Sequence, residues 1–348
     1  MSDSNFASKP IPPSDALPPV EPPSAAFLVQ LFLIPGVIVG VIVLVWVLFN
    51  WIAQSGGADP QDYVEALRRN SPDVWQKAEQ LAEMLHNDHR NELKGNPALA
   101  GELADILDQR IAAGQMDKSD VDLRVYLSKA LGQFNTPVGL PALMKAAATN
   151  RDEAEMPVRR AALDAIGSLA VNIQATTSAP LTDPALVDAL LTASRDPASV
   201  IRLRAAYVLG IVGGQKAIDR LAEVLSDPYP DVAYNAATGL ARHGDVRAID
   251  ELAAMLEVGE TSPAVASEEA DLRDEKRWAI VVNALRAVGQ LAEANPKADL
   301  SRVAPQVRAW QKPDASAAFG VADVPLPVRE AALATGEAIQ QRDSAARH

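Results

Sequence analysis

The sequence predicts an all-α protein: a long stack of helix pairs preceded by a single transmembrane helix. Three observations predict this class. Residues 31–49 carry no polar side chain, the chain beyond about residue 60 alternates Ala- and Leu-rich runs with short breaks, and these runs show no sustained two-residue alternation. Apolar residues three and four apart indicate a helix face, whereas strict alternation would indicate a strand. We therefore expect helices in the apolar segment and in the zone beyond about residue 60.

Composition and charge narrow the classes of function. The 348 residues include 45 acidic and 32 basic side chains, for a formal net charge of −13. Nucleic acids and anionic lipid surfaces both favour basic proteins, so we expect no nucleic-acid partner and no helix lying flat on lipid. The chain has no cysteine and four histidines. Disulfides and iron–sulfur clusters are therefore excluded, and we expect no metal site and no cofactor.

The chain opens with a proline-rich segment, residues 1–24. Prolines are crowded between Pro10 and Pro23, with Ser and Asp among them. Proline lacks the amide proton that helices and sheets use, and this composition provides nothing to bury. We expect a disordered tail that acts as a spacer, and a proline-rich docking motif is the alternative.

The next segment, residues 25–53, is predicted to be a transmembrane helix, followed by a linker over residues 54–62. No charged residue occurs between Glu21 and Asp59. As a helix, residues 31–49 would span about 28 Å, close to the hydrocarbon thickness of a bilayer, and lipid requires a single span to be helical. A cleaved signal peptide is the rival interpretation. The apolar run is too long for one, no basic cluster precedes it, and no Ala-x-Ala site follows it.

Two glycines in this segment, Gly36 and Gly40, lie four residues apart. On a membrane helix this spacing makes a groove that allows two helices to touch, so it predicts a homodimer through this face. The alternative is that the glycines are incidental, because glycine is common in membrane helices. Pro35 precedes them, removes one helical hydrogen bond and favours a kink.

The rest of the chain is internally repetitive. Six stretches share one pattern: 123–132 (LRVYLSKALG), 158–167 (VRRAALDAIG), 201–210 (IRLRAAYVLG), 232–241 (VAYNAATGLA), 280–289 (IVVNALRAVG) and 328–337 (VREAALATGE). Their first, fifth, eighth and ninth residues are mostly aliphatic or small, and this spacing places them on one helical face. Four stretches close with a glycine: Gly132, Gly167, Gly210 and Gly289. We expect each glycine to end its helix in a left-handed cap.

The stretch 195–227 shows the pattern most fully, with Asp-Pro in the turn, Ile201-Arg202 at the helix start and Leu209-Gly210 near its end. It resembles the HEAT repeat, in particular the short bacterial form of phycobilisome-lyase-type HEAT proteins. The resemblance implies a right-handed α–α superhelix over residues 63–340, followed by a disordered C-terminus over residues 341–348. Insertions at 171–183, 257–275 and 311–325 exceed the usual turn. We expect the acidic second insertion to be mobile.

Arginine recurs at the second position of four of these helices, as Arg124, Arg159, Arg202 and Arg329. A repeated position implies a repeated structural role. We therefore expect each arginine to pair with acids or carbonyls in the turns between neighbouring repeats. Binding of an acidic ligand is the alternative.

The third and seventh positions of the same helices point the same way, because they are four residues apart. In HEAT-like solenoids the second helix of each pair lines the concave face, so the resemblance implies a groove there for a protein or peptide partner. The predicted groove residues are Arg160, Asp164, Leu203, Tyr207, Tyr234, Thr238, Val282 and Arg286. The alternative is that some of these positions pack between repeats.

No catalytic motif is present in the sequence, neither G-x-S-x-G nor a phosphate-binding loop. Residues 86–92 (HNDHRNE) have metal-compatible spacing, but we expect a polar loop there. The predicted function is a membrane-anchored scaffold or adaptor rather than an enzyme. The alternatives are an accessory or lyase-like factor of an enzyme system, and a self-assembling membrane protein that pairs through Gly36 and Gly40.

The distribution of basic residues bears on the side of the membrane. The tail holds one base, Lys9, whereas Arg68 and Arg69 follow the apolar segment. Basic residues favour the cytoplasmic side. We therefore expect the repeats in the cytoplasm, and the reverse topology, with the repeats outside the cell or in the periplasm, is the alternative. The resemblance to a bacterial form of the HEAT repeat implies that the membrane is a bacterial inner membrane.

Overall fold

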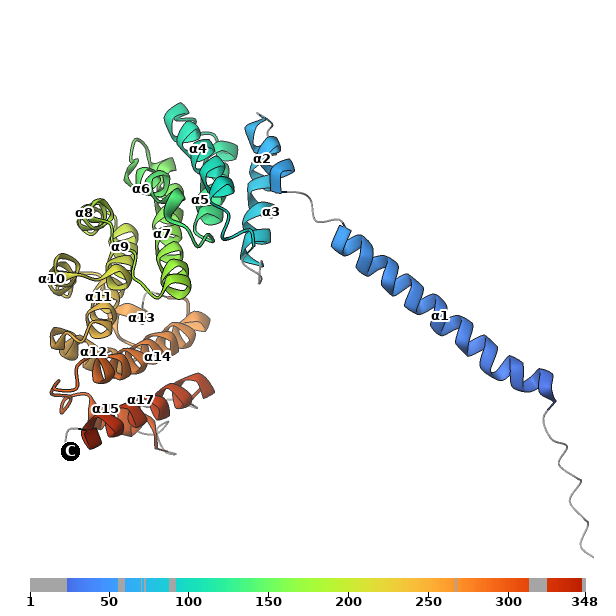
Figure 1. Ribbon diagram of the computed structural model, residues 1–348. Helices are drawn as coiled ribbons and strands as arrows, with labels where there is room; N and C mark the ends of the chain where they lie inside the picture. The colour runs from blue at the N-terminus through green and yellow to red at the C-terminus, as the bar shows by residue number, and fades with distance from the viewer. Residues whose placement is uncertain are drawn as a thin grey trace, which may run out of the picture. The chain divides into compact units, whose positions relative to one another are not determined.

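The computed structural model of the chain (Figure 1) describes residues 24–55, 60–69, 71, 73–87, 92–266, 268–312 and 324–345. Over these residues every regular element is helical, which confirms the predicted all-α class. The structure divides into two compact units, one ending at Asp59 and the other beginning at Pro60. The predicted tail, apart from Ser24, and the middle of the predicted linker lie outside the described residues.

The first unit contains α1, Ala25–Ser55, so the segment predicted over residues 25–53 is confirmed as a helix. Pro35 lies inside α1. Every side chain over residues 33–48 is exposed, and most of them are Val, Ile or Leu. Among the residues described, no helix is at once long enough and apolar enough to cross a membrane. The membrane span therefore stays a prediction.

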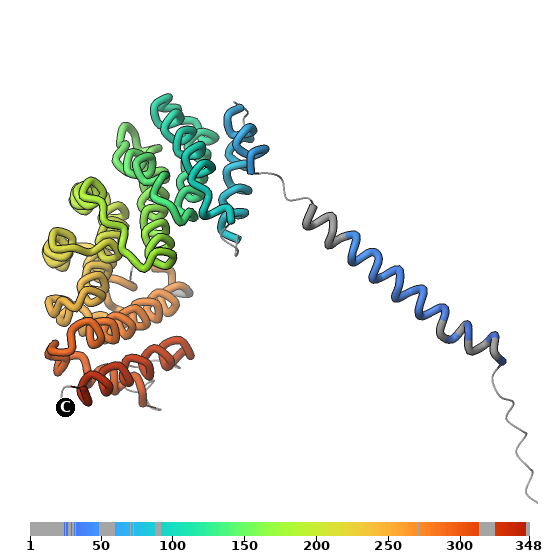
Figure 2. The backbone as a smooth tube through the Cα atoms, viewed as in Figure 1, coloured from blue at the N-terminus to red at the C-terminus, as the bar shows by residue number. Residues whose placement is uncertain are grey.

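The second unit is a stack of helix pairs in two layers. The outer layer contains α2 (Pro60–Arg68), α4 (Pro97–Ala113), α6 (Leu140–Ala148), α8 (Pro184–Ala193), α10 (Gln215–Val224), α12 (Ile249–Leu256) and α15 (Ala304–Trp310). The inner layer contains α3 (Val74–His86), α5 (Lys118–Leu131), α7 (Met156–Thr177), α9 (Ser199–Val212), α11 (Pro230–Arg242), α14 (Ala270–Ala294) and α17 (Leu326–Ala345). Within this unit the pairs follow one another along an arc, with the inner layer on its concave side (Figure 2).

Short helical segments occupy several of the connections. They are α13 (Pro263–Ala266) and the 3₁₀ turns η1 (Pro137–Gly139), η2 (Glu153–Glu155) and η3 (Val246–Ala248). Two of these turns, η2 and η3, are each preceded by an aspartate whose side chain accepts a backbone hydrogen bond. Such caps satisfy amide groups that would otherwise be left without a partner at the start of a turn.

The repeat pattern explains the inner layer. The six repeated stretches fall one each on α5, α7, α9, α11, α14 and α17. Their fifth residues are all fully buried: Leu127, Ala162, Ala205, Ala236, Ala284 and Ala332. Each inner helix packs on the next one along the stack. Small residues at this position allow close approach, so one apolar face per helix builds a continuous core.

The expectation that the pattern glycines end helices in left-handed caps is wrong. Gly167, Gly210 and Gly289 lie inside α7, α9 and α14, and Gly132 follows α5 with a φ of −67°. A Cβ on Gly210 would lie 2.7 Å from the Cα of Gly239 in α11. Gly210 is therefore needed for the close contact of two inner helices, a role that periodicity alone does not distinguish from a cap.

The acidic insertion at 257–275 also differs from expectation in its described residues. It carries α13, and α14 begins within it. Val265 is fully buried. Lys276 Nζ lies 2.9 Å from both Glu268 Oε1 in the insertion and Asp231 Oδ2 in α11. A few buried apolar side chains and the ion pairs of Lys276 hold this segment against the stack, although its average composition is acidic. The prediction of a mobile segment is therefore wrong for these residues.

The structure also describes the first insertion and most of the predicted C-terminal tail. Residues 171–177 extend α7, and residues 178–183 connect it to α8. Residues 341–345 complete α17, so the predicted disorder is wrong for that part of the C-terminus. Most of the third insertion, 311–325, lies outside the described residues.

Three of the recurrent arginines join consecutive repeats, as predicted. Each donates to an acid in the turn of the next repeat: Arg124 to Glu155, Arg159 to Asp196, and Arg202 to Asp227. Each also donates to a backbone carbonyl. The structural role is therefore confirmed for these three side chains, and Arg329 occupies the corresponding position in α17.

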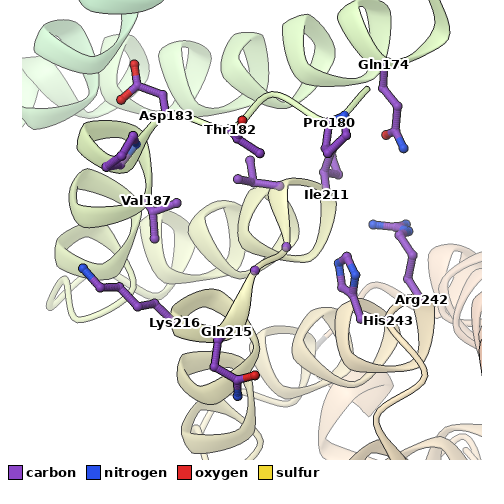
Figure 3. Close-up of a pocket in the computed structure, with 14 residues that line it drawn as sticks. Gln174, Pro180, Thr182, Asp183, Val187, Ile211, Gln215, Lys216, Arg242 and His243 are labelled. Carbon is purple, nitrogen blue, oxygen red and sulfur yellow. The ribbon is translucent and has the colours of Figure 1, made fainter. Parts of the chain in front are cut away.

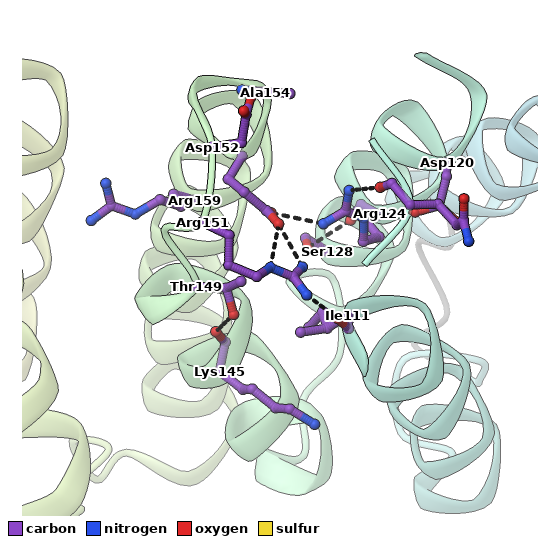
Figure 4. A network of polar contacts seen from close by, with 12 residues as sticks. Ile111, Asp120, Arg124, Ser128, Lys145, Thr149, Arg151, Asp152, Ala154 and Arg159 are labelled. Carbon is purple, nitrogen blue, oxygen red and sulfur yellow. Dashed lines mark hydrogen bonds and ion pairs between the residues drawn. The ribbon is translucent and has the colours of Figure 1, made fainter. Parts of the chain in front are cut away.

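The first of these pairs belongs to a buried network (Figure 4). Glu155 is fully buried, and its two carboxylate oxygens accept hydrogen bonds from Arg124 at 2.7 Å and from Arg151 at 2.5 and 3.0 Å. Arg124 Nε also donates to Asp120 Oδ2 at 2.9 Å. Burial raises the pKa of Asp120, against the lowering effect of the Arg124 charge. The network connects α5 to the turn before α7.

Candidate functional site

The predicted groove residues all lie in the inner layer, but they differ in exposure. The exposed members are Arg160, Asp164, Tyr207 and Arg286. Leu203 and Thr238 are half-buried, whereas Tyr234 and Val282 are each only 9% exposed. Two of the eight side chains therefore offer little surface to a partner. Binding through the exposed members stays a prediction.

Tyr234 is covered by the insertion that follows α12. Its side chain belongs to the hydrophobic core and shares a hydrogen bond with Ser262, just before α13. Burial raises the pKa of Tyr234 above its ordinary value. The repeat pattern predicted the same exposure for Tyr207 and Tyr234. Tyr234 is less exposed than Tyr207 because the insertion that carries α13 covers it, and this insertion belongs to one repeat alone.

The exposed patch on α7 and α9 centres on Tyr207, which is 43% exposed. The ring lies against α7, because a Cβ on Gly167 would stand 3.1 Å from Tyr207 Cε1. One turn earlier on α7, Asp164 pairs with Arg204 of α9 at 3.0 Å. Arg160, a further turn earlier, is exposed and has no ion pair among the described residues. We call these residues of α7 and α9 the tyrosine patch.

A groove with a volume of about 410 Å³ lies in the inner layer between α14 and α17. Arg286, Gln290 and Glu293 line it from α14, and Ala334 and Thr335 line it from α17. The predicted residue Arg286 therefore stands at the edge of a groove. No sequence pattern predicted this groove, although the run of small residues in the last repeat was a signal for it.

A larger pocket of about 1000 Å³ lies between the ends of α7, α9 and α11 and the starts of α8 and α10. Polar side chains on its wall include Gln174, Arg242 and His243, and apolar ones include Pro180, Val187 and Ile211 (Figure 3). We call it the edge pocket. No sequence pattern predicted this pocket. Its signal was the insertion at 171–183, which supplies part of the wall.

Metal-binding clusters are absent from the part of the chain that the structure describes: no three His, Cys, Asp or Glu side chains are grouped so as to hold an ion. His86, the first residue of the predicted polar loop 86–92, ends α3, and its Nδ1 lies 3.3 Å from Gln133 Oε1. Most of that loop lies outside the described residues.

Gly36 and Gly40 lie one turn apart on α1. Apart from the adjoining residues and the backbone of α1 itself, no heavy atom lies within 4 Å of the position that a Cβ would take on either residue. Within α1, therefore, no side chain fills the space beside the two glycines. The predicted homodimer stays a prediction.

Comparison with known proteins supports the repeat architecture. A family model described as HEAT repeats matches residues 184–270, which contain α8 to α13 and, on α9, Arg204 and Tyr207 of the tyrosine patch. No curated protein matches the sequence significantly. The HEAT-like character is thus shown for this part of the helical stack, while the phycobilisome-lyase type has no support.

Several solved structures are similar to the chain. YibA of E. coli has 16% identity and a TM-score of 0.42, over 84% of this chain and 96% of that one. An engineered protein has 14% identity and a TM-score of 0.34, over 82% and 97%. Human deoxyhypusine hydroxylase in complex with glycerol has 17% identity and a TM-score of 0.31, over 81% and 96%. Likeness at this level says nothing about what the present chain binds or catalyses.

Proposed function

We propose that the chain is a protein-interaction scaffold, without catalytic activity of its own, whose partner binds the inner face of the helix stack. The tyrosine patch carries the proposal. Tyr207 is exposed yet held against α7 at Gly167, and the Asp164–Arg204 pair and the exposed Arg160 follow one and two turns earlier along α7. Repeat stacks provide extended concave faces, and tyrosine and arginine are enriched where proteins bind one another.

Membrane attachment of this scaffold through α1, with the stack in the cytoplasm, is the second part of the proposal. The exposed side chains over residues 33–48 support it, because they include no charged group. Each buried aliphatic side chain is worth about 1.5–3 kcal/mol relative to water, so such a helix favours lipid or another apolar surface. Attachment would raise the local concentration of a partner at the membrane.

The binding surface can be tested by affinity capture of the full chain from the cells that make it, after cross-linking. We expect a discrete partner to be lost when Tyr207→Ala is combined with Arg286→Ala. The matched control combines Tyr229→Ala with Arg308→Ala, which changes the same two residue types in the turn before α11 and in α15. A partner retained equally by both double variants would contradict the choice of the inner face.

Membrane attachment is tested separately by fractionation. The full chain should stay in the membrane pellet after an alkaline carbonate wash, and a variant lacking residues 25–53 should move to the soluble fraction. Protease added to intact cells should leave the stack uncut. A full chain released by carbonate would contradict anchoring without affecting the choice of binding surface.

A further inference from the structure

We propose that the edge pocket is a binding site for a small organic anion that has an apolar body. This site is independent of the inner face on which the scaffold proposal rests. Its volume of about 1000 Å³ suits a small organic molecule, because ligand pockets commonly measure about 300–1,000 Å³. Most of its residues belong to one repeat and the segment that precedes it.

The body of the ligand would lie against an apolar wall. Pro180, Val187, Ile211 and Val212 form this wall, from the α7–α8 connection, α8 and the end of α9. Ile211 and Val212 are less than a tenth exposed and belong to the packed part of α9. The wall is therefore held by the core of the stack, and it does not need to form when a ligand arrives.

The anionic group of the ligand would meet Arg242 and His243. Arg242 Nη1 and His243 Nε2 lie 2.9 and 3.0 Å from the same acceptor, the carbonyl oxygen of Gly210. This shared contact fixes both side chains at the end of α11, and in Figure 3 they extend in the direction of Gln174. Among the described residues Arg242 has no ion pair, so its charge is available to a ligand.

The acidic groups near the pocket do not neutralise this charge. Asp183 is the one carboxylate in the lining, and its Oδ1 accepts hydrogen bonds from the backbone amides of Ala185 and Leu186 at the start of α8. Lys216 adds a second cation to the lining, in contact with the exposed Asp188 at 3.3 Å. Arg242 is therefore the lining cation without a carboxylate partner among the described residues, and its charge favours an anionic ligand over a cationic one.

The pocket exists because the chain departs from its repeat at this point. α7 continues to Thr177, and Ser178 then reverses the chain with a φ of 57°. The connection that follows carries Pro180 and closes one side. On the other side the turn at Gly213 has a φ of 69°, and a Cβ there would stand 2.5 Å from His243 Cε1. A shorter connection after α7 would remove Pro180 from the apolar wall and open the pocket on that side.

The test is isothermal titration of the full chain in nanodiscs of zwitterionic lipid, with empty nanodiscs as the blank. The probes are 2-naphthoate, 2-naphthyl phosphate and the neutral 2-naphthylmethanol. We expect either anion to bind more tightly than the alcohol, by about tenfold, because charge-assisted hydrogen bonds are the strong ones. The tighter of the two anions identifies whether a carboxylate or a phosphate is preferred.

Two substitutions of exposed lining residues test whether the anion binds in the edge pocket. Arg242→Gln should weaken the preferred anion by about tenfold, and Gln174→Glu should weaken it by placing a negative charge beside the ligand. Arg308→Gln, an exposed arginine of α15, is the control and should bind as the unaltered chain does. Helical circular dichroism would verify that the variants fold. Equal binding of alcohol and anions, absence of binding, or unchanged affinity in both pocket variants would overturn the proposal.

Discussion

Arg202 binds Asp227 through two hydrogen bonds, from Nε to Oδ2 at 2.6 Å and from Nη2 to Oδ1 at 2.9 Å. Arg202 lies in α9, and Asp227 lies in the turn between α10 and α11, so the pair joins one repeat to the next. The backbone amide of Tyr229 also donates to Asp227, at 3.0 Å. The hydrogen bond from Arg202 lowers the pKa of Asp227 below its ordinary value.

The first prediction concerns this pair and its dependence on pH. Asp227→Asn should lower the free energy of unfolding at pH 7 by about 1.5–3 kcal/mol, the usual value of hydrogen bonds to charged groups. Because the pKa of Asp227 is lower in the folded chain than in the unfolded one, its stabilisation is present above the unfolded pKa and is lost as the pH falls through the folded pKa. The variant and the unaltered chain should therefore converge in stability once the pH falls below the folded pKa of Asp227.

Urea unfolding of the full chain in non-ionic micelles, at neutral and acidic pH, measures both effects. The control is Asp250→Asn, which removes an exposed ion pair with Arg302 and should cost less than about 1 kcal/mol. If the two variants lost equal stability at pH 7, the Arg202–Asp227 pair would have no special role in joining the repeats.

The second prediction concerns close contact between α9 and α11. Gly210→Ala should destabilise the stack by about 1–3 kcal/mol, because the new Cβ would stand 2.7 Å from the Gly239 Cα and the two helices must separate. Gly101→Ala in α4 is the matched control, since its Cβ would meet only Val138 Cγ1 at 3.7 Å. That control should be neutral or slightly stabilising, because alanine favours helix. Thermal unfolding, monitored by circular dichroism, compares the two variants. Equal melting temperatures would refute the role of Gly210 in the close packing of α9 and α11.

The third prediction concerns the buried network at Glu155. Glu155→Ala should cost about 3–5 kcal/mol, because it leaves the fully buried Arg124 without one of its carboxylate partners. Glu153→Ala, in the same short turn but exposed, should stay within about 0.5 kcal/mol of the unaltered chain. The denaturant midpoints of the two variants and of the unaltered chain measure these changes in stability. A small effect at Glu155 would mean that water replaces its carboxylate without penalty.

The fourth prediction concerns the open face of α1. Gly36→Leu combined with Gly40→Leu should abolish cross-linked dimers in membranes, because bulky side chains prevent the backbones from approaching. Ile38→Leu combined with Ile42→Leu changes another face of the helix conservatively and should leave the dimers in place. Dimers that survive the glycine substitutions would exclude this face as the contact.

Periodicity was sufficient to predict the inner layer, because burial of one face repeats at the same spacing in every repeat. The fifth residue of each stretch is fully buried, as its position predicts. Arg124, Arg159 and Arg202 at the second position also pair as predicted, since a repeated position meets a repeated turn. Gly210 was misassigned, because a cap and a close helix contact both favour glycine and only the neighbouring Gly239 distinguishes them.

The candidate sites depend on the insertions that interrupt the repeat more than on the repeat itself. Tyr207 and Tyr234 hold comparable positions in the pattern, yet one is 43% exposed and the other 9%. The insertion around α13 covers Tyr234, and average composition had indicated a mobile acidic segment there. The edge pocket likewise arises where α7 and its connection exceed the repeat.

The sequence by itself determined the helical class, the repeated faces that form the core and the arginines that join the repeats, because these depend on spacing along the chain. Only the tertiary structure decided which inner-face side chains stay exposed, why Gly210 has no side chain and where the edge pocket lies. These features depend on contacts between segments distant in sequence, such as Arg242 with Gly210, and no local pattern specifies such contacts.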